Sequence, residues 1–335
     1  MTDKIKVAVI GAGMMGKNHI KTYQSLPEFE LVGVYDIFPD AAQAAAETFH
    51  IKAFSTLQEV VENVDAVSVV TTSVTHADVG EFFLSQGIHC LIEKPLATTE
   101  TGCYRLINAA KKSGATLLVG HIERFNPAVE QLSKILSDPS KIRSLTAQRM
   151  SAASSRILDV DVAMDLMIHD IEVVQSLVKS KVTNVEAMSV KTKDMPEGKD
   201  YISALVQFEN GVTANLTASR ITQSRVRTLS VTTDENYISL DFINQSIDVC
   251  TQSRSPYTNK DALPQWMNYG LKGCEEHLFI PSAQPLAAEQ SHFAACILQK
   301  ATPRVTGEDA LEALRVIWAI ESKLGLFESA QSKAA

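Results

Sequence analysis

The first third of this chain alternates short, nearly all-apolar runs rich in β-branched residues with longer helical patterns. Runs of this kind are typical of strands that are covered on both faces. Strands alternating with helices build βαβ units, in which the strands lie parallel. The pattern therefore predicts a doubly wound parallel sheet with strands at Ile5–Gly11, Glu30–Asp36, Asp65–Thr72, His89–Pro95 and Thr116–His121.

The pattern changes after residue 121. A helix is expected after Pro127, a strand over Lys141–Met150 and another helix near Asp165, and Val182–Cys250 then reads as consecutive strands. Strands joined by short turns, among them the hairpin dipeptide Asn210-Gly211, predict an antiparallel sheet with helices on one face.

The fold expected for the whole chain is α/β with two domains. Residues 1–121 form the parallel domain, and residues 122–330 form an α+β domain with a large, mostly antiparallel open sheet. Two helices near Ala287–Lys300 and Glu308–Gly325 end the fold, and the last one can pack back on the first domain. Thr251–Trp266 is expected to be a polar loop or flap.

Composition excludes several classes of protein. A formal net charge of −8 disfavours a nucleic-acid partner, because phosphate binding needs a basic face. The chain shows no secretory signal and no apolar run as long as a membrane span, so no membrane partner is expected. The cysteines are five in number and scattered, which favours reduced thiols in a cytoplasmic enzyme. His, Cys and carboxylate residues do not cluster at metal-ligand spacing, so no metal is expected.

Three glycines follow the first strand directly and open a helix: Gly11, Gly13 and Gly16. In this context Gly11 permits a tight turn, Gly13 lets the backbone approach a pyrophosphate, and Gly16 lets the helix pack on the sheet. The free N–H groups and the positive dipole end of the helix would then face the phosphates. The turn predicts dinucleotide binding in a Rossmann domain, with Met14 and Met15 of the same turn also in contact with the cofactor.

Asp36 ends the second strand, 20 residues after Gly16. An acid at this place accepts hydrogen bonds from the adenosine ribose hydroxyls and repels a 2′-phosphate. The next residues, Ile37 and Phe38, include no arginine that could bind that phosphate. NAD is therefore expected rather than NADP.

The apolar strand "HCLIEKP" ends in Glu93, Lys94 and Pro95. Charged residues at the end of a buried strand are costly unless they are used, and ligands of open parallel sheets bind beyond the carboxyl ends of the strands. A lysine there can donate to a substrate oxygen and stabilise developing negative charge. Pro95 is expected to fix the chain after Lys94, with a cis peptide bond as one way to do so.

Asp165 and His169 are four residues apart, so on a helix they share one face. A histidine that titrates near neutral pH is suited to accept a proton from an alcohol, and Asp165 could orient it or bind a neighbouring hydroxyl. Asp170 is rotated by about 100° from His169 and should not share its role.

Several motifs occur together in one order: "AVIGAGMMGKNH", "VTTSVTHADV", "CLIEKPLATT", "GHIERFNPAV", the Asp165/His169 pair and "VTGEDALEALRV". Over nearly its whole length the chain resembles the glucose–fructose oxidoreductase, inositol dehydrogenase and rhizopine-catabolism (Gfo/Idh/MocA) superfamily. The resemblance implies a catalytic Lys94 with Asp165 and His169 on the substrate side. It also implies a nicotinamide site lined by Thr71, Thr72, His76, Glu93, Lys94 and His121.

A narrower resemblance, to bacterial UDP-N-acetylglucosamine 3-dehydrogenases, is visible in "GHIERFNPAV", "DVDVAMDLMIHDIE" and "ANLTASRITQSRVRTLSV". It implies a sugar-nucleotide substrate, and the expected substrate contacts are Lys94, Arg124, Asn126, Arg156, Asp165 and His169. The large open sheet of the superfamily implies a homodimer or homotetramer. Cations suit a sugar diphosphate, and arginines lie in the segments expected around the second-domain cleft: Arg124, Arg149, Arg156, Arg220 and Arg225.

The expected function is thus NAD-dependent oxidation of a hydroxyl of a sugar or sugar nucleotide, above all the 3-hydroxyl of UDP-N-acetylglucosamine. Two alternatives keep the fold: a general sugar or polyol dehydrogenase or aldose reductase, and a relative that uses NAD transiently to cleave glycosides. A third, of another class, is a sensor that binds the dinucleotide without turnover. The presence of Lys94 and His169 favours an enzyme.

Overall fold

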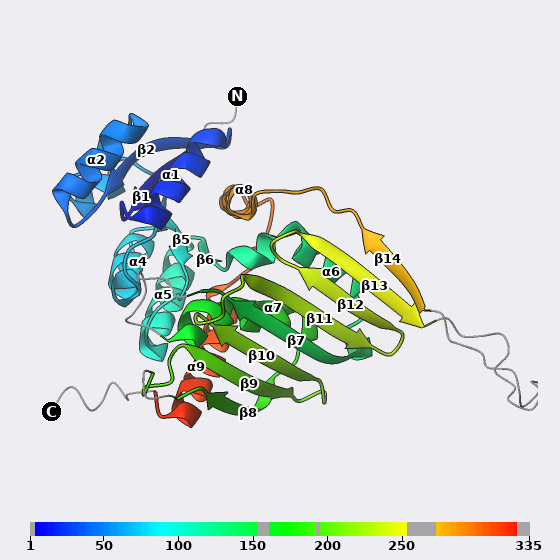
Figure 1. Ribbon diagram of the computed structural model, residues 1–335. Helices are drawn as coiled ribbons and strands as arrows, with labels where there is room; N and C mark the ends of the chain where they lie inside the picture. The colour runs from blue at the N-terminus through cyan, green and yellow to red at the C-terminus, as the bar shows by residue number, and fades with distance from the viewer. Residues whose placement is uncertain (1–3, 153–160, 192–194, 253–272, 327–335) are drawn as a thin grey trace, which may run out of the picture. The chain divides into compact units, whose positions relative to one another are not determined.

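The computed structural model describes residues 4–152, 161–191, 195–252 and 273–326 (Figure 1). The chain forms two compact units, the first from Met1–Phe125 and Ala283–Arg315 and the second from Asn126–Ser282 and Val316–Ala335. The segment Ala283–Arg315 thus belongs to the first unit, whereas the division expected from the sequence placed it in the second domain.

In the first unit, six described strands form one parallel sheet in the order β3-β2-β1-β4-β5-β6. Their bounds are β1 Ile5–Ile10, β2 Phe29–Tyr35, β3 Lys52–Ala53, β4 Ala66–Val69, β5 His89–Glu93 and β6 Leu117–Gly120. The predicted strands are confirmed, and the short β3 is an addition. The order reverses between β1 and β4, and ligands of such sheets bind beyond the carboxyl ends of the strands at that point.

The helices of this unit are α1 Met14–Ser25, α2 Pro39–Phe49, α3 Leu57–Val61, α4 His76–Leu84, α5 Glu100–Ser113 and α8 Pro285–Ile297, with short 3₁₀ turns η1 Ser73–Thr75 and η2 Ile122–Phe125. The Thr99 hydroxyl caps the start of α5, and Gly114 ends this helix in the left-handed conformation. Helix α1 packs against α2 and α8, and Phe293 of α8 joins the apolar core with Ile20 and Leu91. The C-terminal segment therefore completes the core of the first unit.

The described strands of the second unit form an eight-stranded sheet in the order β14-β13-β12-β11-β7-β10-β9-β8. Their bounds are β7 Ile142–Met150, β8 Val182–Ser189, β9 Tyr201–Phe208, β10 Thr213–Ser219, β11 Val226–Thr233, β12 Asn236–Asp241, β13 Ser246–Gln252 and β14 Gly273–Leu278. β7 and β10 pair parallel, and the other neighbours pair antiparallel. Gly211, with φ +85°, makes the predicted turn between β9 and β10. Residues 253–266 of the expected loop lie outside the described residues.

Helices cover one face of this sheet. α6 (Pro127–Ile135) contacts β12 and β13, and α7 (Ile168–Val178) contacts β7 and β10. A π-helical turn, η4 (Ala163–Met167), leads into α7, a 3₁₀ turn, η3 (Pro139–Lys141), precedes β7, and α9 (Gly307–Leu324) begins in the first unit and ends in the second. Along β9 buried and exposed residues alternate, with Ala204 and Val206 inside and Leu205 outside, so the opposite face is open.

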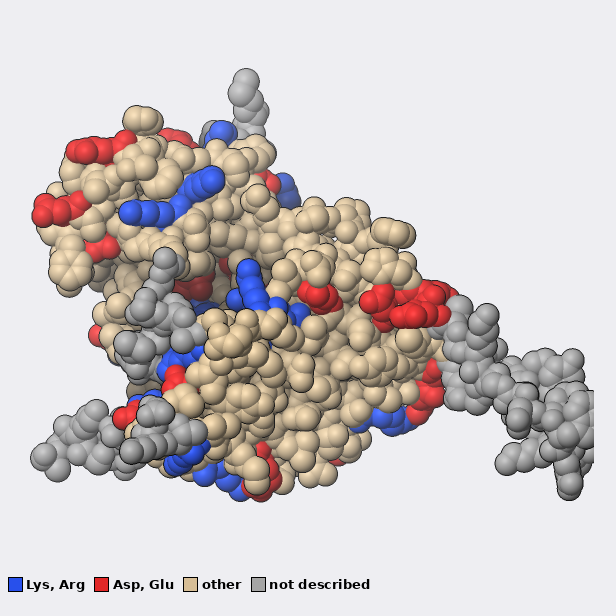
Figure 2. Space-filling model, viewed as in Figure 1, with Lys and Arg blue, Asp and Glu red and all other residues tan. Residues whose placement is uncertain are grey.

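Acidic side chains gather at the β13–β14 end of the second unit's sheet (Figure 2), where Glu275 and Glu276 are exposed and Asp248 pairs with His277. Such a surface repels the phosphates of nucleic acids. In the part of the chain that the structure describes, no helix is long and apolar enough to cross a membrane.

Candidate active site

The turn Gly11–Gly16 joins β1 to α1 and depends on close backbone approaches. Gly11 has φ +110°, and a Cβ atom on it would lie 2.5 Å from the carbonyl oxygen of Val70. A Cβ atom on Gly16 would lie 1.9 Å from the Gly11 carbonyl oxygen, so only glycine lets the helix start here. A Cβ atom on Gly13 would meet nothing within 4 Å. The open space beside Gly13, at the N-terminus of α1, therefore fits a pyrophosphate group.

The Asp36 carboxylate fastens this turn to the end of β2. Its Oδ2 accepts a hydrogen bond from the Ala12 N–H at 2.7 Å, and its Oδ1 accepts one from the Phe38 N–H at 2.9 Å. A carboxylate has about four lone-pair sites, so acceptor capacity for two ribose hydroxyls is left. Its predicted role as the ribose ligand therefore fits the geometry.

Several large apolar side chains in and beside these loops are exposed to solvent. Met14 and Met15, expected from the sequence, follow β1; Ile37 and Phe38, which are 78% and 71% exposed, follow β2; and Val74 follows β4. Exposed apolar patches of this kind often mark ligand surfaces. Ile37, Phe38 and Val74 are candidate cofactor contacts that were not predicted from the sequence, although the segments that follow β2 and β4 were recognisable there.

Glu93, the last residue of β5, forms a buried ion pair. Its Oε1 lies 3.0 Å from His19 Nε2, and its Oε2 accepts the Lys94 main-chain N–H at 3.1 Å. Burial alone would raise the pKa of Glu93, but the hydrogen bond and charge of His19, together with the charge of Lys94, hold it below its usual value. The carboxylate thus ties the main chain at Lys94 to His19 of α1.

The Lys94–Pro95 peptide bond is cis, one of the ways that the sequence analysis gave for fixing the chain there. The His76 ring joins this turn to the end of β4, because its Nδ1 lies 2.8 Å from the Pro95 carbonyl oxygen and its Nε2 3.2 Å from that of Thr71. Burial lowers the pKa of His76, and the hydrogen bonds to the two carbonyl oxygens oppose that shift. Thr71 also accepts a hydrogen bond from the Thr75 hydroxyl at 2.8 Å.

His121, just after β6, is buried, and its pKa is lowered to about 3 by burial and by the positive charge of Lys94. The first unit therefore brings together most of the predicted nicotinamide-site residues at one edge of the sheet: Thr71, His76, Glu93, Lys94 and His121. Thr72, the residue after Thr71, is exposed and precedes η1.

Glu289 of α8 has no role in the site expected from the sequence, yet it lies close to Glu93. Its side chain is completely buried, and neither carboxyl oxygen has a hydrogen-bond partner among the described residues. Burial and the negative charge of Glu93 raise its pKa well above the usual value. Both effects favour the protonated form of Glu289. Glu289 and Glu93 are far apart in the sequence, so no sequence pattern predicts that they lie close together.

In the second unit, Asp165 lies in the π-helical turn and His169 in α7, on one continuous helical segment as predicted. The next residue, Asp170, is buried and binds the Arg149 guanidinium of β7 at 2.8 Å. Arg149 also stacks over the Phe242 ring, 5.0 Å from its centroid. This pair docks α7 on the sheet, and it agrees with the separate role expected for Asp170.

The other predicted substrate contacts have varied surroundings. In the first unit, the Arg124 guanidinium donates to the Arg304 carbonyl oxygen at 3.4 Å. Asn126 caps α6 through the Ala128 N–H and donates to the Phe242 carbonyl oxygen. Arg220 pairs with Asp200, and Arg225 is exposed. Arg156 lies outside the described residues.

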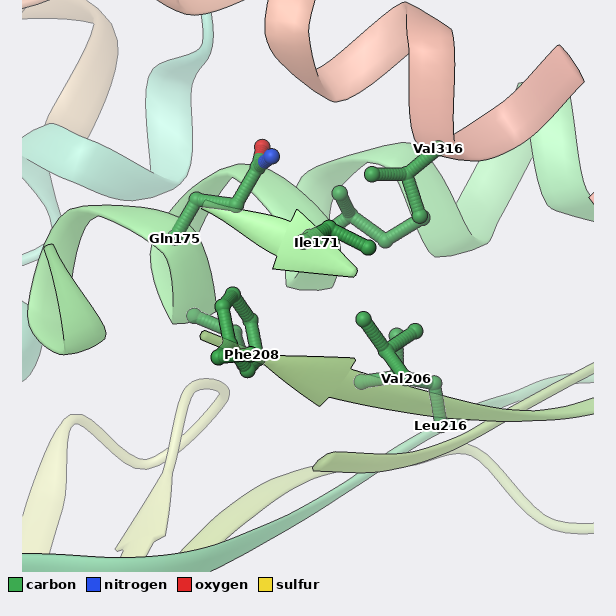
Figure 3. A pocket seen from close by; sticks show the side chains of 8 residues that line it. Ile171, Gln175, Val206, Phe208, Leu216 and Val316 are labelled. Atoms are coloured by element: carbon green, nitrogen blue, oxygen red, sulfur yellow. The ribbon is translucent and has the colours of Figure 1, made fainter. Parts of the chain in front are cut away.

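A pocket between α7, the strands β8, β9 and β10, and the second-unit end of α9 does not suit a sugar (Figure 3). Its lining is apolar except for Gln175, with Ile171, Val174, Val182, Val206, Phe208, Leu216 and Val316 as the other residues. A sugar site needs several convergent polar groups. The described residues contain no group of three or more potential metal ligands.

Comparison with known proteins decides the family. The model of an oxidoreductase family with an NAD-binding Rossmann fold matches residues 5–121, and the model of the GFO/IDH/MocA C-terminal domain matches residues 138–239. UDP-N-acetylglucosamine 3-dehydrogenase from Acidithiobacillus ferrooxidans is 33% identical over 245 residues, which cover 73% of this chain and 76% of that protein. The chain belongs to the GFO/IDH/MocA oxidoreductase family.

Solved structures of similar proteins share the fold of this chain. The A. ferrooxidans UDP-N-acetylglucosamine 3-dehydrogenase GnnA superposes with a TM-score of 0.85 at 29% identity, over 96% of this chain and 99% of that one. GenD2 from gentamicin A biosynthesis, in complex with NAD, has the same fold, with a TM-score of 0.78 at 19% identity over 97% of this chain and 95% of that one. Inositol 2-dehydrogenase from Rhizobium meliloti is 27% identical over 232 residues, which are 64% of this chain and 69% of that protein.

Membership in the GFO/IDH/MocA family confirms the predicted fold and cofactor. The protein is an oxidoreductase that binds NAD in its first unit. The open space at Gly13 and the remaining acceptor capacity of Asp36 fit that cofactor.

Proposed function

We propose that this protein oxidises a hydroxyl of a sugar nucleotide with NAD, and that the substrate is UDP-N-acetylglucosamine, oxidised at its 3-hydroxyl. The observation that carries the proposal is the likeness to UDP-N-acetylglucosamine 3-dehydrogenase, which reaches 33% identity and extends in structure over 96% of the chain. Inositol 2-dehydrogenases are less similar, at 27–29% identity.

The residues of the first unit would hold NAD and activate the substrate oxygen. Gly11, Gly13 and Gly16 leave room for the pyrophosphate, and Asp36 binds the ribose. NAD supplies a hydride acceptor when bound. Lys94 donates a hydrogen bond to the substrate oxygen and stabilises the negative charge that develops there. Its main chain is fastened by the Glu93 carboxylate at 3.1 Å.

The residues of the second unit would handle the proton and the sugar. His169 accepts the hydroxyl proton as the general base, and Asp165 orients His169 or binds a neighbouring hydroxyl. Arg124, Asn126 and Arg156 are proposed to contact the substrate, where an arginine fork can bind two phosphate oxygens at once. A diphosphate held in this way gives binding energy remote from the reacting carbon, which positions the ring.

The deciding experiment compares UDP-N-acetylglucosamine with free N-acetylglucosamine at saturating NAD, with reduced nicotinamide as the readout. UDP-N-acetylglucosamine should be oxidised far faster than the free sugar, and at lower concentration. Trapping the product with borodeuteride should place one deuterium on carbon 3. Equal efficiency with both sugars would favour a general sugar dehydrogenase, and NAD binding without any turnover would favour a sensor.

A control variant separates chemistry from folding in that experiment. Lys94→Met should lower turnover roughly a hundredfold or more, whereas Lys112→Met removes an equal charge from an exposed position of α5 and should leave turnover unchanged. Equal rates in the two variants would remove Lys94 from the reaction.

We also propose that the protein acts in the cytoplasm as a homodimer or homotetramer. Cys90 and Cys103 are completely buried, and burial raises the pKa of both thiols, which suits inert reduced cysteines. Exposed apolar residues on the open sheet, Met188 and Leu205, suit a subunit contact. Light scattering on the purified protein tests this, and a monomeric mass would contradict it.

A further inference from the structure

Two buried carboxyl groups of the second unit meet at the start of the segment that carries Asp165 and His169. They are Asp161, 7% exposed, just before the π-helical turn, and Glu321, 8% exposed, on α9 (α7 and α9 in Figure 1). The two carboxyl groups lie within hydrogen-bonding reach of each other. Neither residue belongs to the site that the sequence predicts.

Asp161 caps the π-helical turn. Its Oδ1 accepts the N–H groups of Ala163 at 2.8 Å and Met164 at 3.0 Å, and its main-chain oxygen accepts the N–H of Asp165 at 3.1 Å. These contacts satisfy N–H groups that the first turn of a helix leaves without partners. The position of Asp165, and of His169 one turn later, therefore depends on where the Asp161 carboxylate lies.

A proton is needed between the two carboxyl groups, because two buried carboxylates side by side repel each other. Burial, and then the charge and hydrogen bond of Asp161, raise the pKa of Glu321 to about 8. Glu321 is therefore protonated at neutral pH and donates its hydrogen bond to Asp161.

The charged groups around the pair do not replace that proton. Among the described residues, the charge that raises the pKa of Glu321 is that of Asp161. Lys323, on the same helix, binds Glu186 of β8 at 3.0 Å. From the segment before β9, Lys199 accepts the Val162 N–H with its carbonyl oxygen, and its ammonium group binds Glu197.

We propose that Glu321 is a positioning residue, whose protonated carboxyl group holds the Asp161 cap and so keeps Asp165 and His169 in place; this rests on the role proposed above for that pair. Glu321 itself does not touch the substrate. When Glu321 ionises, the shared hydrogen bond is lost and two negative charges are left side by side. The cap then loosens, and turnover falls at alkaline pH.

The test uses Glu321→Gln, which keeps a neutral donor of the same shape but cannot ionise. Wild type and variant should have equal kcat near pH 6.5. Above about pH 8 the kcat of the wild type should fall with the loss of one proton, while that of the variant stays level. Glu312→Gln, an exposed position on the same helix, is the matched control and should follow the wild type. Profiles of the same shape in wild type and Glu321→Gln would overturn the proposal.

Hydrogen exchange keeps the test independent of turnover. In a peptide covering residues 161–171, wild type and Glu321→Gln should exchange alike at pH 6.5, and the wild type should exchange at least tenfold faster than the variant at pH 9. Equal exchange at both pH values in an enzyme that oxidises UDP-N-acetylglucosamine would refute the positioning role and leave the function standing. The exchange difference without any turnover would support the carboxyl pair and refute the proposed function instead.

Discussion

Replacing Asp36 with alanine should weaken NAD binding through two separate effects. The first is loss of the acceptor for the ribose hydroxyls. The second is internal, because Asp36 accepts the N–H groups of Ala12 and Phe38, and so fixes the glycine turn even before the cofactor binds. The two effects have different readouts, since only the second changes the protein without NAD.

The magnitudes follow from the surroundings of each bond. The Ala12 N–H is partly buried, and leaving such a donor without an acceptor costs about 1–3 kcal/mol of the free energy of unfolding. The Phe38 N–H is exposed and can turn to water at little cost. Each charge-assisted bond to the ribose contributes about 1.5–3 kcal/mol, or roughly ten- to hundredfold in Kd, so two bonds give at least about a hundredfold. NADP should lose much less, because the repulsion of its 2′-phosphate disappears.

Two assays check these values: urea unfolding of the protein without cofactor, and titration with NAD and NADP. Asp40→Ala is the control, because it removes the same charge from an exposed position in the first turn of α2. If Asp36→Ala matched this control in both the unfolding midpoint and the NAD-to-NADP affinity ratio, the reasoning from the two backbone bonds and from the ribose would be refuted together.

Three further predictions concern single side chains. Lys94→Met should lower turnover roughly a hundredfold or more and leave the Kd for NAD nearly unchanged, because the lost donor acts on the substrate oxygen. A near-normal kcat would exclude Lys94 from the reaction. His169→Asn should lower kcat by about 10²–10⁴, the usual contribution of a general base, and an active variant would move that role to Asp165. Glu289→Gln should change how stability depends on pH. Because folding raises the pKa of Glu289, its contribution is complete below the unfolded-state pKa and is lost as pH rises, so the wild type should lose about 1.4 kcal/mol per pH unit relative to the variant while Glu289 stays protonated. Urea midpoints from pH 5 to 8 measure this, and parallel curves would contradict a buried neutral acid.

Features of the fold that depend on residues close together in the sequence could be predicted. The parallel strands, the glycine turn with Asp36 and the Asn210-Gly211 hairpin each lie within a few tens of residues, so local pattern and turn chemistry identify them. The hydrogen bonds of Asp36 to Ala12 and Phe38 are a detail that this pattern does not contain.

The partners of buried charged groups could not be predicted in the same way. Glu93 binds His19 from 74 positions away, and Glu321 meets Asp161 from the far end of the second unit. A sequence shows that a charge must be paired if it is buried, but the choice of partner is made by tertiary packing. The π-helical turn before α7 is hidden for another reason, since its residues follow the same apolar pattern as an ordinary helix.

The division of the first unit into two stretches of chain has a consequence for synthesis on the ribosome. Its sheet is complete at Gly120, but Phe293 and Ala294 of its apolar core arrive only with the segment Ala283–Arg315. At about 5–20 residues per second, the ribosome takes on the order of ten to forty seconds to go from residue 125 to residue 315. During that interval the nascent unit exposes the α1 surface that α8 later covers. A released fragment ending at Phe125 should therefore bind chaperones or aggregate, and adding residues 283–315 as a separate peptide should restore its solubility.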